Sequence, residues 1–159
     1  MLKYQRIFEL DDELYDFHLL QKQYYLLEGI IPTKRYLIEQ MNNPEGYDEK
    51  NHYIKKIYYQ EKMIALIDYQ IGYRFSMKHD DNCLWIGLLL VDEAWQRKKF
   101  GKKIIEHIID EYNEICHIIQ LACIKDNLKG LGFWKALGFK EIDVSRWENI
   151  EVIVLEKVI

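Results

Sequence analysis

The stretch WIGLLLVDEAWQRKKFGKKIIEHIIDEYN, residues 85–113, decides the fold. Apolar residues occupy both parities of residues 84–91, which predicts a central strand that is buried on both faces. From Ile104 to Tyr112 the apolar residues recur at the spacing of one helix face. The stretch therefore predicts a buried strand, a short turn and an amphipathic helix, in that order.

Five cations crowd the turn between this strand and this helix. They surround Gly101 and are Arg97, Lys98, Lys99, Lys102 and Lys103. The backbone N–H groups and the dipole of a helix start already attract anions, and the cations strengthen that field. A bound polyphosphate would explain why lysines occupy a first helical turn, where they are normally disfavoured. The alternative is a basic turn that contacts only solvent.

The composition is that of one folded domain spanning residues 1–159, with 49% hydrophobic and 14% aromatic residues. A formal charge of −4 argues against general nucleic-acid binding, in spite of the basic turn. No apolar run reaches the roughly 20 residues that span a bilayer, and the start MLKYQRIFELDDE has no signal-peptide core. Three cysteines, an odd number, indicate buried reduced thiols. We expect a cytoplasmic protein with no membrane partner.

The first half of the chain predicts one strand, two helices and a hairpin. Residues 4–9 alternate as a strand does, and Asp11 or Asp12 can cap a helix that continues to about Gly29. Thr33 caps a short second helix that extends to Met41. A loop follows over 42–51, and then come two strands joined as an antiparallel hairpin, residues 53–59 and 63–71.

The second half predicts alternating strands and helices. A loop over 72–82 leads into the central strand, and another buried strand follows the amphipathic helix. Asn127 opens a last helix that ends at Gly138, and two hairpin strands close the chain. These three strands are residues 117–123, 140–146 and 150–157. We therefore expect an α/β protein with a central mixed sheet and helices on both faces. The last strand could be a sheet edge that pairs with a second chain as a homodimer.

Two motifs on these elements resemble the acetyl-CoA signature of the GNAT superfamily of N-acetyltransferases. In that family a central strand is followed by Gln or Arg, two residues, Gly, one residue, and Gly or Ala; Gln96 to Gly101 supply this turn. A second family pattern has Asn, then Phe-Tyr six residues later, then Leu-Gly-Phe. Its counterparts are Asn127, Phe133, Trp134, Leu137, Gly138 and Phe139. The resemblance implies the GNAT-like acyl-CoA N-acyltransferase fold over the whole chain.

The chain departs from the family pattern at two positions. Lys99 replaces the first glycine of the turn, and a lysine can serve there if its backbone stays in the ordinary helical region. Trp134 replaces a tyrosine that is thought to protonate the leaving CoA thiolate. An indole N–H donates a hydrogen bond but is no usable acid at neutral pH. Protonation would then come from water or from another tyrosine.

The resemblance implies which residues hold acetyl-CoA. The backbone of Leu89 and Val91 would pair with the pantetheine arm, the amides of Arg97 to Lys102 would cradle the pyrophosphate, and Asn127 would hold the pantetheine. The full predicted set is Leu89, Leu90, Val91, Gln96, Arg97, Lys98, Lys99, Phe100, Gly101, Lys102, Asn127 and Trp134. No metal is expected. The chemistry would be direct attack of a neutral amine on the thioester.

Asp68 is the candidate general base, with Trp134 as the second candidate catalytic residue. Asp68 shares its strand parity with Ile64 and Leu66, so its carboxylate lies either at a wet strand end or in a pocket that raises its pKa. Asp92 and Glu93 are rivals, although acidic residues before a helix more often act as caps. The acceptor wall is predicted from aromatic and acidic residues of the first half: Tyr24, Tyr25, Glu28, Tyr36 and Tyr47.

We therefore expect an enzyme, an acyltransferase that moves an acetyl group from acetyl-CoA to a primary amine of a small molecule or peptide. The alternative is an acyl-CoA-binding sensor or interaction module with the same fold and little turnover. Trp134 and the uncertain base keep this alternative open.

Overall fold

The computed structural model describes all 159 residues, Met1–Ile159, and separates them into two compact units. Unit 1 comprises Met1–Tyr69 and Leu88–Gly101, and unit 2 comprises Gln70–Gly87 and Lys102–Ile159. The chain therefore passes from one unit to the other three times, within strand β3, strand β4 and helix α4. None of the helices is both long and apolar enough to cross a bilayer.

The strands follow the hydrogen-bonded order β1-β2-β3-β4-β5-β7-β6. β4 pairs with β5 in parallel, whereas the β1–β2, β5–β7 and β6–β7 pairs are antiparallel. This confirms the prediction of a mixed sheet with the strand before the basic turn at its centre. The prediction that the last strand is an edge is wrong, because the hairpin places β6 outside β7 and leaves β1 and β6 as the edges.

Unit 1 begins with β1 (Leu2–Ile7), which pairs with β2 (His52–Tyr59). Three helices lie between these strands in the sequence, α1 (Asp12–Leu20), α2 (Lys22–Glu28) and α3 (Lys34–Gln40). The prediction of one helix up to Gly29 is wrong, because Gln21 leaves the helical region at φ −87° and ψ 60°. The side-chain amide of Gln21 donates instead to the Phe17 carbonyl at 3.1 Å. Thr33 caps α3 as predicted.

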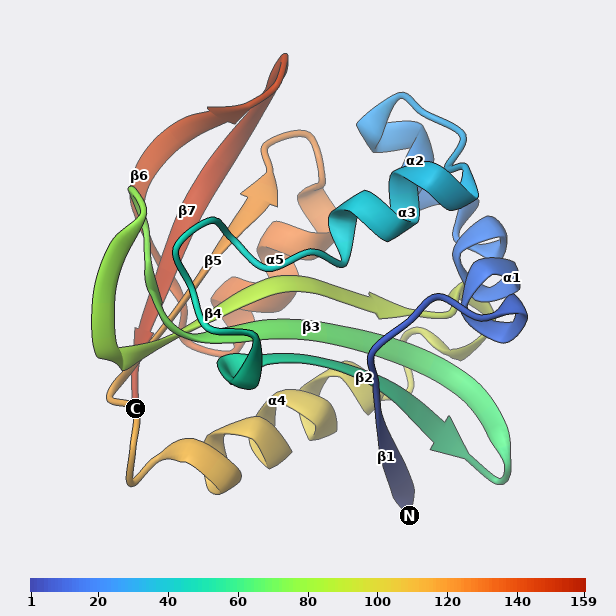
Figure 1. Cartoon of the computed structure of the whole chain (residues 1–159), viewed down its shortest axis with the longest axis horizontal. Coiled ribbons are helices and arrows are strands. Elements are labelled where there is room, and N and C mark those ends of the chain that lie inside the picture. The colour runs from blue at the N-terminus through green and yellow to red at the C-terminus, as the bar shows by residue number, and fades with distance from the viewer. The chain divides into compact units, whose positions relative to one another are not determined.

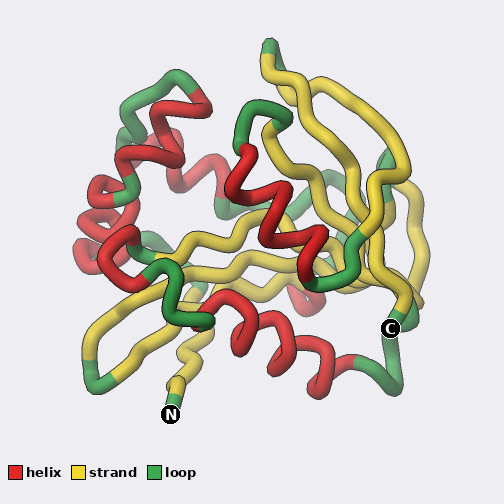
Figure 2. The backbone as a smooth tube through the Cα atoms, turned by 180° about the vertical axis from the view of Figure 1, so that it is seen from behind, coloured by secondary structure: helices red, strands yellow, loops and turns green.

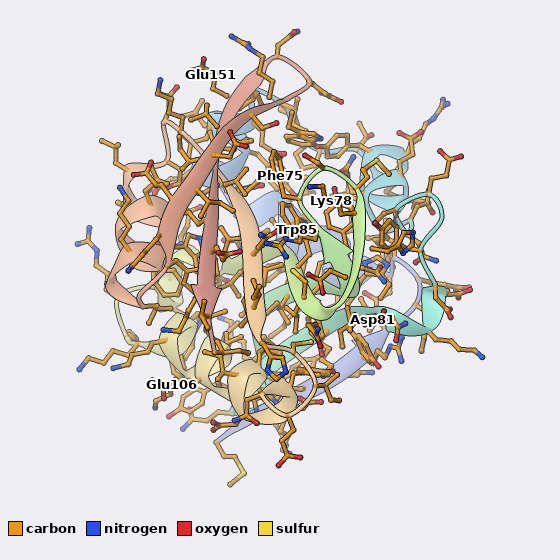
Figure 3. The ribbon with its side chains drawn as sticks, turned by 90° about the vertical axis from the view of Figure 1, so that its left-hand side faces the viewer. Phe75, Lys78, Asp81, Trp85, Glu106 and Glu151 are labelled. Carbon is orange, nitrogen blue, oxygen red and sulfur yellow. The ribbon has the colours of Figure 1, made fainter.

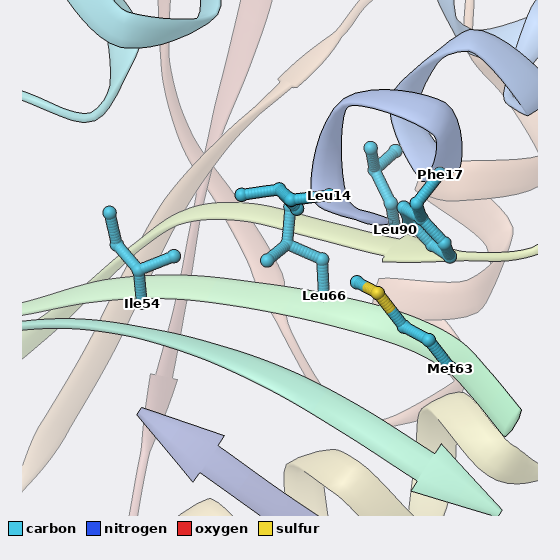
Figure 4. Packing of buried hydrophobic residues seen from close by; sticks show 6 residues of the cluster. All are labelled: Leu14, Phe17, Ile54, Met63, Leu66 and Leu90. Atoms are coloured by element: carbon cyan, nitrogen blue, oxygen red, sulfur yellow. The ribbon is translucent and has the colours of Figure 1, made fainter. Parts of the chain in front are cut away.

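The core of unit 1 joins α1 to three strands. Leu14 and Phe17 are directed from α1 toward Leu66 of β3 (Lys62–Arg74) and Leu90 of β4 (Lys78–Val91), as Figure 4 shows. All four side chains are at most 5% exposed. Full burial of one such side chain contributes roughly 1.5–3 kcal/mol, so these contacts dominate the placement of α1.

A buried lysine with two exposed carboxylates fixes the start of α1 on β2. Lys56 of β2 is 3% exposed, and its ammonium donates to Asp11 at 2.5 Å and to Glu13 at 2.8 Å. Asp11 also caps α1 by accepting from the Leu14 N–H at 2.8 Å. One carboxylate therefore serves both as helix cap and as partner of a buried cation, which would be costly to leave unpaired.

Two hairpins connect the central strands. β2 and β3 run side by side in Figure 1, and the two-residue turn between them holds Gln60 and Glu61 at positive φ, as predicted for a hairpin. The predicted loop over 72–82 is wrong, because β3 continues to Arg74 and β4 already begins at Lys78. The exposed polar side chains of this segment indicated a loop, although backbone pairing alone suffices for an exposed hairpin.

The tip of the β3–β4 hairpin is held within unit 2. Figure 3 labels Phe75 and Lys78 at this tip and Trp85 further along β4. The Phe75 N–H donates at 2.9 Å to the side-chain oxygen of Gln120, which is 1% exposed. The amide nitrogen of Gln120 donates to Glu156 at 2.9 Å, so one buried amide connects the hairpin tip to β7 (Ile150–Val158).

The remainder of unit 2 follows the predicted order of elements. It contains most of α4 (Phe100–Tyr112), β5 (Ile118–Ile124), α5 (Leu128–Ala136) and β6 (Lys140–Trp147). β6 and β7 form a long antiparallel hairpin, seen as two yellow strands in Figure 2. Gly138 follows α5 at φ 93°, the left-handed conformation expected of a residue that ends a helix. All three cysteines are buried and free, which confirms the prediction of buried thiols.

His18 is the buried titratable group of α1. It is 4% exposed, and its Nδ1 is hydrogen-bonded to the Tyr25 hydroxyl at 2.7 Å. Burial lowers the pKa of His18 from 6.5 to about 4, so the ring stays neutral in the folded protein at any pH above that value.

This predicts that the protein loses stability between pH 6.5 and 4. Over that range the unfolded chain binds a proton at His18 that the folded chain does not, so protonation favours unfolding. The free energy of unfolding should fall by about 3 kcal/mol because of this residue. Urea denaturation at several pH values should show a shallower decline in His18→Gln, whose amide can still accept from Tyr25. Parallel declines in the two proteins would contradict the assignment.

Candidate active site

The end of β4 supplies the strand part of the predicted site. Leu90 is 5% exposed and packs in the core of unit 1, whereas Leu89 and Val91 are half-buried. The prediction of burial on both faces is therefore wrong for these last residues of the strand. The N–H of Asp92 donates to the Ile64 carbonyl at 2.8 Å, which holds the strand end beside β3.

The turn that follows is tied back to this strand end. Asp92 is 8% exposed, and its carboxylate accepts from the Ala94 N–H at 3.0 Å, so it caps the short helix η2 (Glu93–Trp95). The side-chain amide of Gln96 donates to the Val91 carbonyl at 2.9 Å. Asp92 thus has a structural role as a cap, in agreement with the sequence-based interpretation.

Two residues of the basic turn have a backbone that favours glycine. Arg97 has φ 64° and Lys99 has φ 65°, both in the left-handed region. The condition that Lys99 keeps an ordinary helical backbone is therefore not met. A side chain in this region costs roughly 1–2 kcal/mol, which explains why glycine suits the position. Lys98 lies between them without a positive φ, and its ammonium lies 4.9 Å from the centre of the Trp95 ring.

The start of α4 differs from the starts of α1, α3 and α5. Those helices are capped by side-chain oxygens of Asp11, Thr33 and Asn127, whereas α4 follows Lys99, whose side chain has no acceptor. No acidic residue lies in the first turn of α4. The cations of the turn and the helix dipole therefore add to each other instead of cancelling.

Phe100 anchors this turn in unit 1. It is 8% exposed, and its ring centre lies 5.0 Å from that of Tyr59 and 5.9 Å from that of Trp95. The aromatic contacts hold the first residue of α4 in place. Lys102, the next predicted residue after Gly101, is 58% exposed, and its ammonium lies 3.9 Å from Glu106.

In unit 2, Asn127 begins α5. Its side-chain oxygen accepts from the Gly130 N–H at 3.0 Å. A Cβ atom at Gly130 would lie 2.4 Å from the Asn127 amide nitrogen, so glycine is needed beside this cap. Trp134 is 7% exposed and packs edge-on against Phe133 and Phe139, with ring centres 4.9 and 5.1 Å away.

Asp68 lies in a half-buried polar cluster that the sequence did not reveal. Its Oδ1 is 2.7 Å from Nε2 of His52, and the other ring nitrogen, Nδ1, is 2.9 Å from Oδ1 of Asn43. The side chains of His52 and Asp68 are 8% and 18% exposed. Burial raises the pKa of the Asp68 carboxyl, and the hydrogen bond with His52 offsets part of that effect. The signal in the sequence was the shared parity of His52 and Ile54, which puts both on one face of β2.

The predicted acceptor wall is only partly available. Tyr25 is 5% exposed and hydrogen-bonded to His18, and Tyr24 packs against the core of unit 1. Tyr36 and Glu28 form a half-buried pair in which the hydroxyl donates to the carboxylate at 3.2 Å. A cationic amine would therefore meet Glu28 and Tyr36 before it met Tyr24 or Tyr25.

The predicted site residues divide between the units. Asp68, Leu89 to Val91 and Gln96 to Gly101 belong to unit 1, whereas Lys102, Asn127 and Trp134 belong to unit 2. No group of three His, Cys, Asp or Glu side chains could hold a metal ion.

Comparison with known proteins identifies a family and a fold. A model of the acetyltransferase (GNAT) family matches residues 6–139. The spermine/spermidine N(1)-acetyltransferase of Bacillus subtilis (strain 168) is 24% identical over 93 residues, which are 56% of this chain. The match covers 61% of that relative, about three fifths of its length.

Solved structures share the fold over nearly the whole chain. An acetyltransferase from Thermus thermophilus superposes with a TM-score of 0.77 at 16% identity, over 99% of this chain and 97% of its own. A GNAT family acetyltransferase from Elizabethkingia anophelis, with acetyl-CoA bound, gives a TM-score of 0.64 at 15% identity, over 99% and 98% of the two chains.

The left-handed backbone of Lys99 predicts that glycine there is stabilising. Lys99→Gly removes the side-chain penalty at φ 65° and should raise the free energy of unfolding by about 0.5–1 kcal/mol. Lys98→Gly makes the same charge change at a residue without positive φ, so it should lower that free energy by a similar amount. Urea denaturation of the two variants tests this, and equal losses in both would contradict the strained turn.

The two glycines of α5 should respond in opposite ways to alanine. At Gly130 the new Cβ displaces the Asn127 cap, which should cost about 1 kcal/mol. At Gly132 nothing lies within 4 Å, so alanine should stabilise the helix by up to about 1 kcal/mol. The melting temperatures of both variants test this prediction. A change of the same sign in both would show that the Asn127 cap is not essential to the stability of α5.

Proposed function

This chain belongs to the GNAT acetyltransferase family, and we propose that it transfers an acetyl group from acetyl-CoA to a primary amine. The observation that carries the proposal is the turn between β4 and α4. Its left-handed residues, its cations and the absence of an acidic first turn suit a pyrophosphate group. The same turn follows a strand end with two half-buried apolar residues, Leu89 and Val91.

In this proposal residues 1–159 act as a single domain that binds acetyl-CoA. The backbone of Leu89 pairs with the pantetheine arm, and the amides from Arg97 to Lys102 hold the pyrophosphate. The Val91 carbonyl already accepts from Gln96, so Leu89 carries more of the pantetheine contact than the resemblance alone implies. Asn127 contributes from the start of α5, where its amide nitrogen is not used by the cap.

The chemistry requires a neutral amine beside the thioester. An amine at neutral pH is mostly an ammonium ion, so a base must take one proton before attack. Asp68 suits this task because burial raises the pKa of its carboxyl. Trp134 supplies a hydrogen-bond donor and no acid, so the leaving thiolate takes its proton from the reacting amine or from water.

A polyamine is the first acceptor to test. The relative from Bacillus subtilis is named for spermine and spermidine, and this chain carries a net charge of −4 that favours cationic substrates. Glu28, with Tyr36 beside it, is the carboxylate of the predicted wall that a second ammonium group would meet. We place the enzyme in the cytoplasm, a reducing compartment that suits three free thiols.

The test is amine-dependent release of CoA thiol from acetyl-CoA. With spermidine the protein should release thiol at a steady rate, and the product should gain one acetyl group by mass spectrometry. Asp68→Asn should lower kcat by about 10²–10³-fold while acetyl-CoA still raises the melting temperature.

Two results would contradict the proposed function. Stabilisation by acetyl-CoA without thiol release across a panel of primary amines would favour the acyl-CoA sensor instead. The absence of stabilisation by either acetyl-CoA or CoA would remove the binding role of the basic turn.

A further inference from the structure

We propose that His52 and Asp68 form a proton-sharing pair that accepts the amine proton during acetyl transfer, and that Asn43 supports both of its proton states. The inference rests on the proposed function and assigns a role to two residues, His52 and Asn43, that the sequence did not single out. His52 acts through Asp68 and is therefore a positioning residue that also stores a proton.

The geometry places an oxygen at each ring nitrogen of His52. Nδ1 lies 2.9 Å from Oδ1 of Asn43, and Nε2 lies 2.7 Å from Oδ1 of Asp68. If Nδ1 carries a proton for Asn43, a further proton must lie between Nε2 and the carboxylate, because two lone pairs would otherwise face each other at 2.7 Å. In that state the pair holds one proton more than a neutral imidazole beside a carboxylate.

The second proton state also fits the same three side chains. When the extra proton leaves, the remaining ring proton sits on Nε2 and is donated to the Asp68 carboxylate. Nδ1 of His52 then becomes an acceptor, and the Asn43 amide can turn its NH₂ group toward it. An asparagine can thus satisfy both states, whereas a carboxylate or an apolar side chain at residue 43 could satisfy only one or neither.

The second oxygen of Asp68 remains available to a substrate. Its Oδ2 has no hydrogen bond to the protein and is not among the fully enclosed polar atoms. Asp68 shares its face of β3 with Leu66, which packs under α1, so most of its surroundings are apolar. A carboxylate with one oxygen held by an imidazole and the other without a protein partner can take a proton at Oδ2 and pass charge to His52.

Three other charged groups of unit 1 have partners of their own. The Arg6 guanidinium of β1 donates to the backbone carbonyl of His52 at 2.8 Å, and Lys56 of β2 is neutralised by two carboxylates next to α1. Glu28 of α2 accepts from Tyr36 of α3. His52 is the hydrogen-bonding partner that offsets part of the effect of burial on the pKa of Asp68, so the two side chains are coupled through that contact.

The proton balance of the reaction needs one acceptor. The ammonium gives one proton to the pair, and the free amine forms a C–N bond to the thioester carbonyl carbon. Collapse of the adduct breaks the C–S bond and releases CoA thiolate. The second nitrogen proton goes to that thiolate, so the products are the amide, CoA thiol and one proton on the pair, which solvent then removes.

The test is the pH dependence of kcat in two single variants and a control. His52→Gln keeps a donor to Asp68 but cannot store a proton, so the acid limb of the profile should move to lower pH by about one unit. Asn43→Asp places a carboxylate at Nδ1 and favours the protonated ring, so the limb should move to higher pH by about one unit.

The matched control is His107→Gln. His107 also faces a carboxylate, Glu111 at 3.3 Å, but this pair lies on α4 with side chains 43% and 40% exposed. Its replacement should leave the acid limb where it is in the wild type. If His52 had only a structural role, His52→Gln and Asn43→Asp would lower kcat. They would not move the acid limb of the pH profile in opposite directions.

A nuclear magnetic resonance titration of the histidine rings separates the possible failures. The His52 signals, assigned by their loss in His52→Gln, should move in two steps in the wild type and in one step in Asp68→Asn. A single step of the His52 signals in both proteins would overturn the proton-sharing pair and leave the proposed function intact. An active enzyme in which neither variant moves the acid limb of the kcat profile would have the same meaning. If the His52 signals move in two steps but the protein acetylates no amine, the proposed function is overturned. The catalytic role of the pair is then overturned as well.

Discussion

The site depends on the way in which the end of β4 is anchored. Leu90 is buried in the core of unit 1, the Asp92 N–H is bonded to Ile64, and the Asp92 side chain caps η2. These contacts fix the place where the strand stops. Gln96 and Phe100 then secure the two ends of the turn, so its left-handed residues are held by the structure on either side. A turn held in this way can keep strained backbone conformations that an isolated segment would not adopt.

Buried polar groups of unit 1 serve two different purposes. Lys56 is fully neutralised by Asp11 and Glu13, and that cluster places α1 on β2. Asp68 is also largely buried, but it has one partner and one open oxygen. In the first cluster the charges of the buried lysine and its two carboxylates offset one another and the role is structural, whereas the second cluster keeps capacity for a further proton. This difference, more than burial itself, distinguishes the candidate catalytic carboxylate from the structural ones.

The sequence predicted the fold well where the apolar pattern was strong. The central strand, the amphipathic helix α4 and the hairpin of β6 and β7 follow from periodicity and from turn residues, because their side chains meet a core on a regular spacing. The break at Gln21 and the strand residues within 72–82 could not be predicted in this way. The break depends on a side-chain contact with Phe17, and the exposed hairpin depends on backbone pairing that leaves no apolar pattern.

The candidate site shows the same division. The residue pattern indicated the basic turn and the family resemblance indicated Asn127, but the meeting of Asn43, His52 and Asp68 joins three segments far apart in the sequence. The central claim is that the turn from Gln96 to Gly101 holds the pyrophosphate of acetyl-CoA. Calorimetric titration with acetyl-CoA and with S-acetylpantetheine, which lacks the pyrophosphate, tests it most directly. We predict that acetyl-CoA binds at least ~100-fold more tightly, about 2.7 kcal/mol, and that this advantage shrinks as salt is added. Equal affinities for the two thioesters would contradict it.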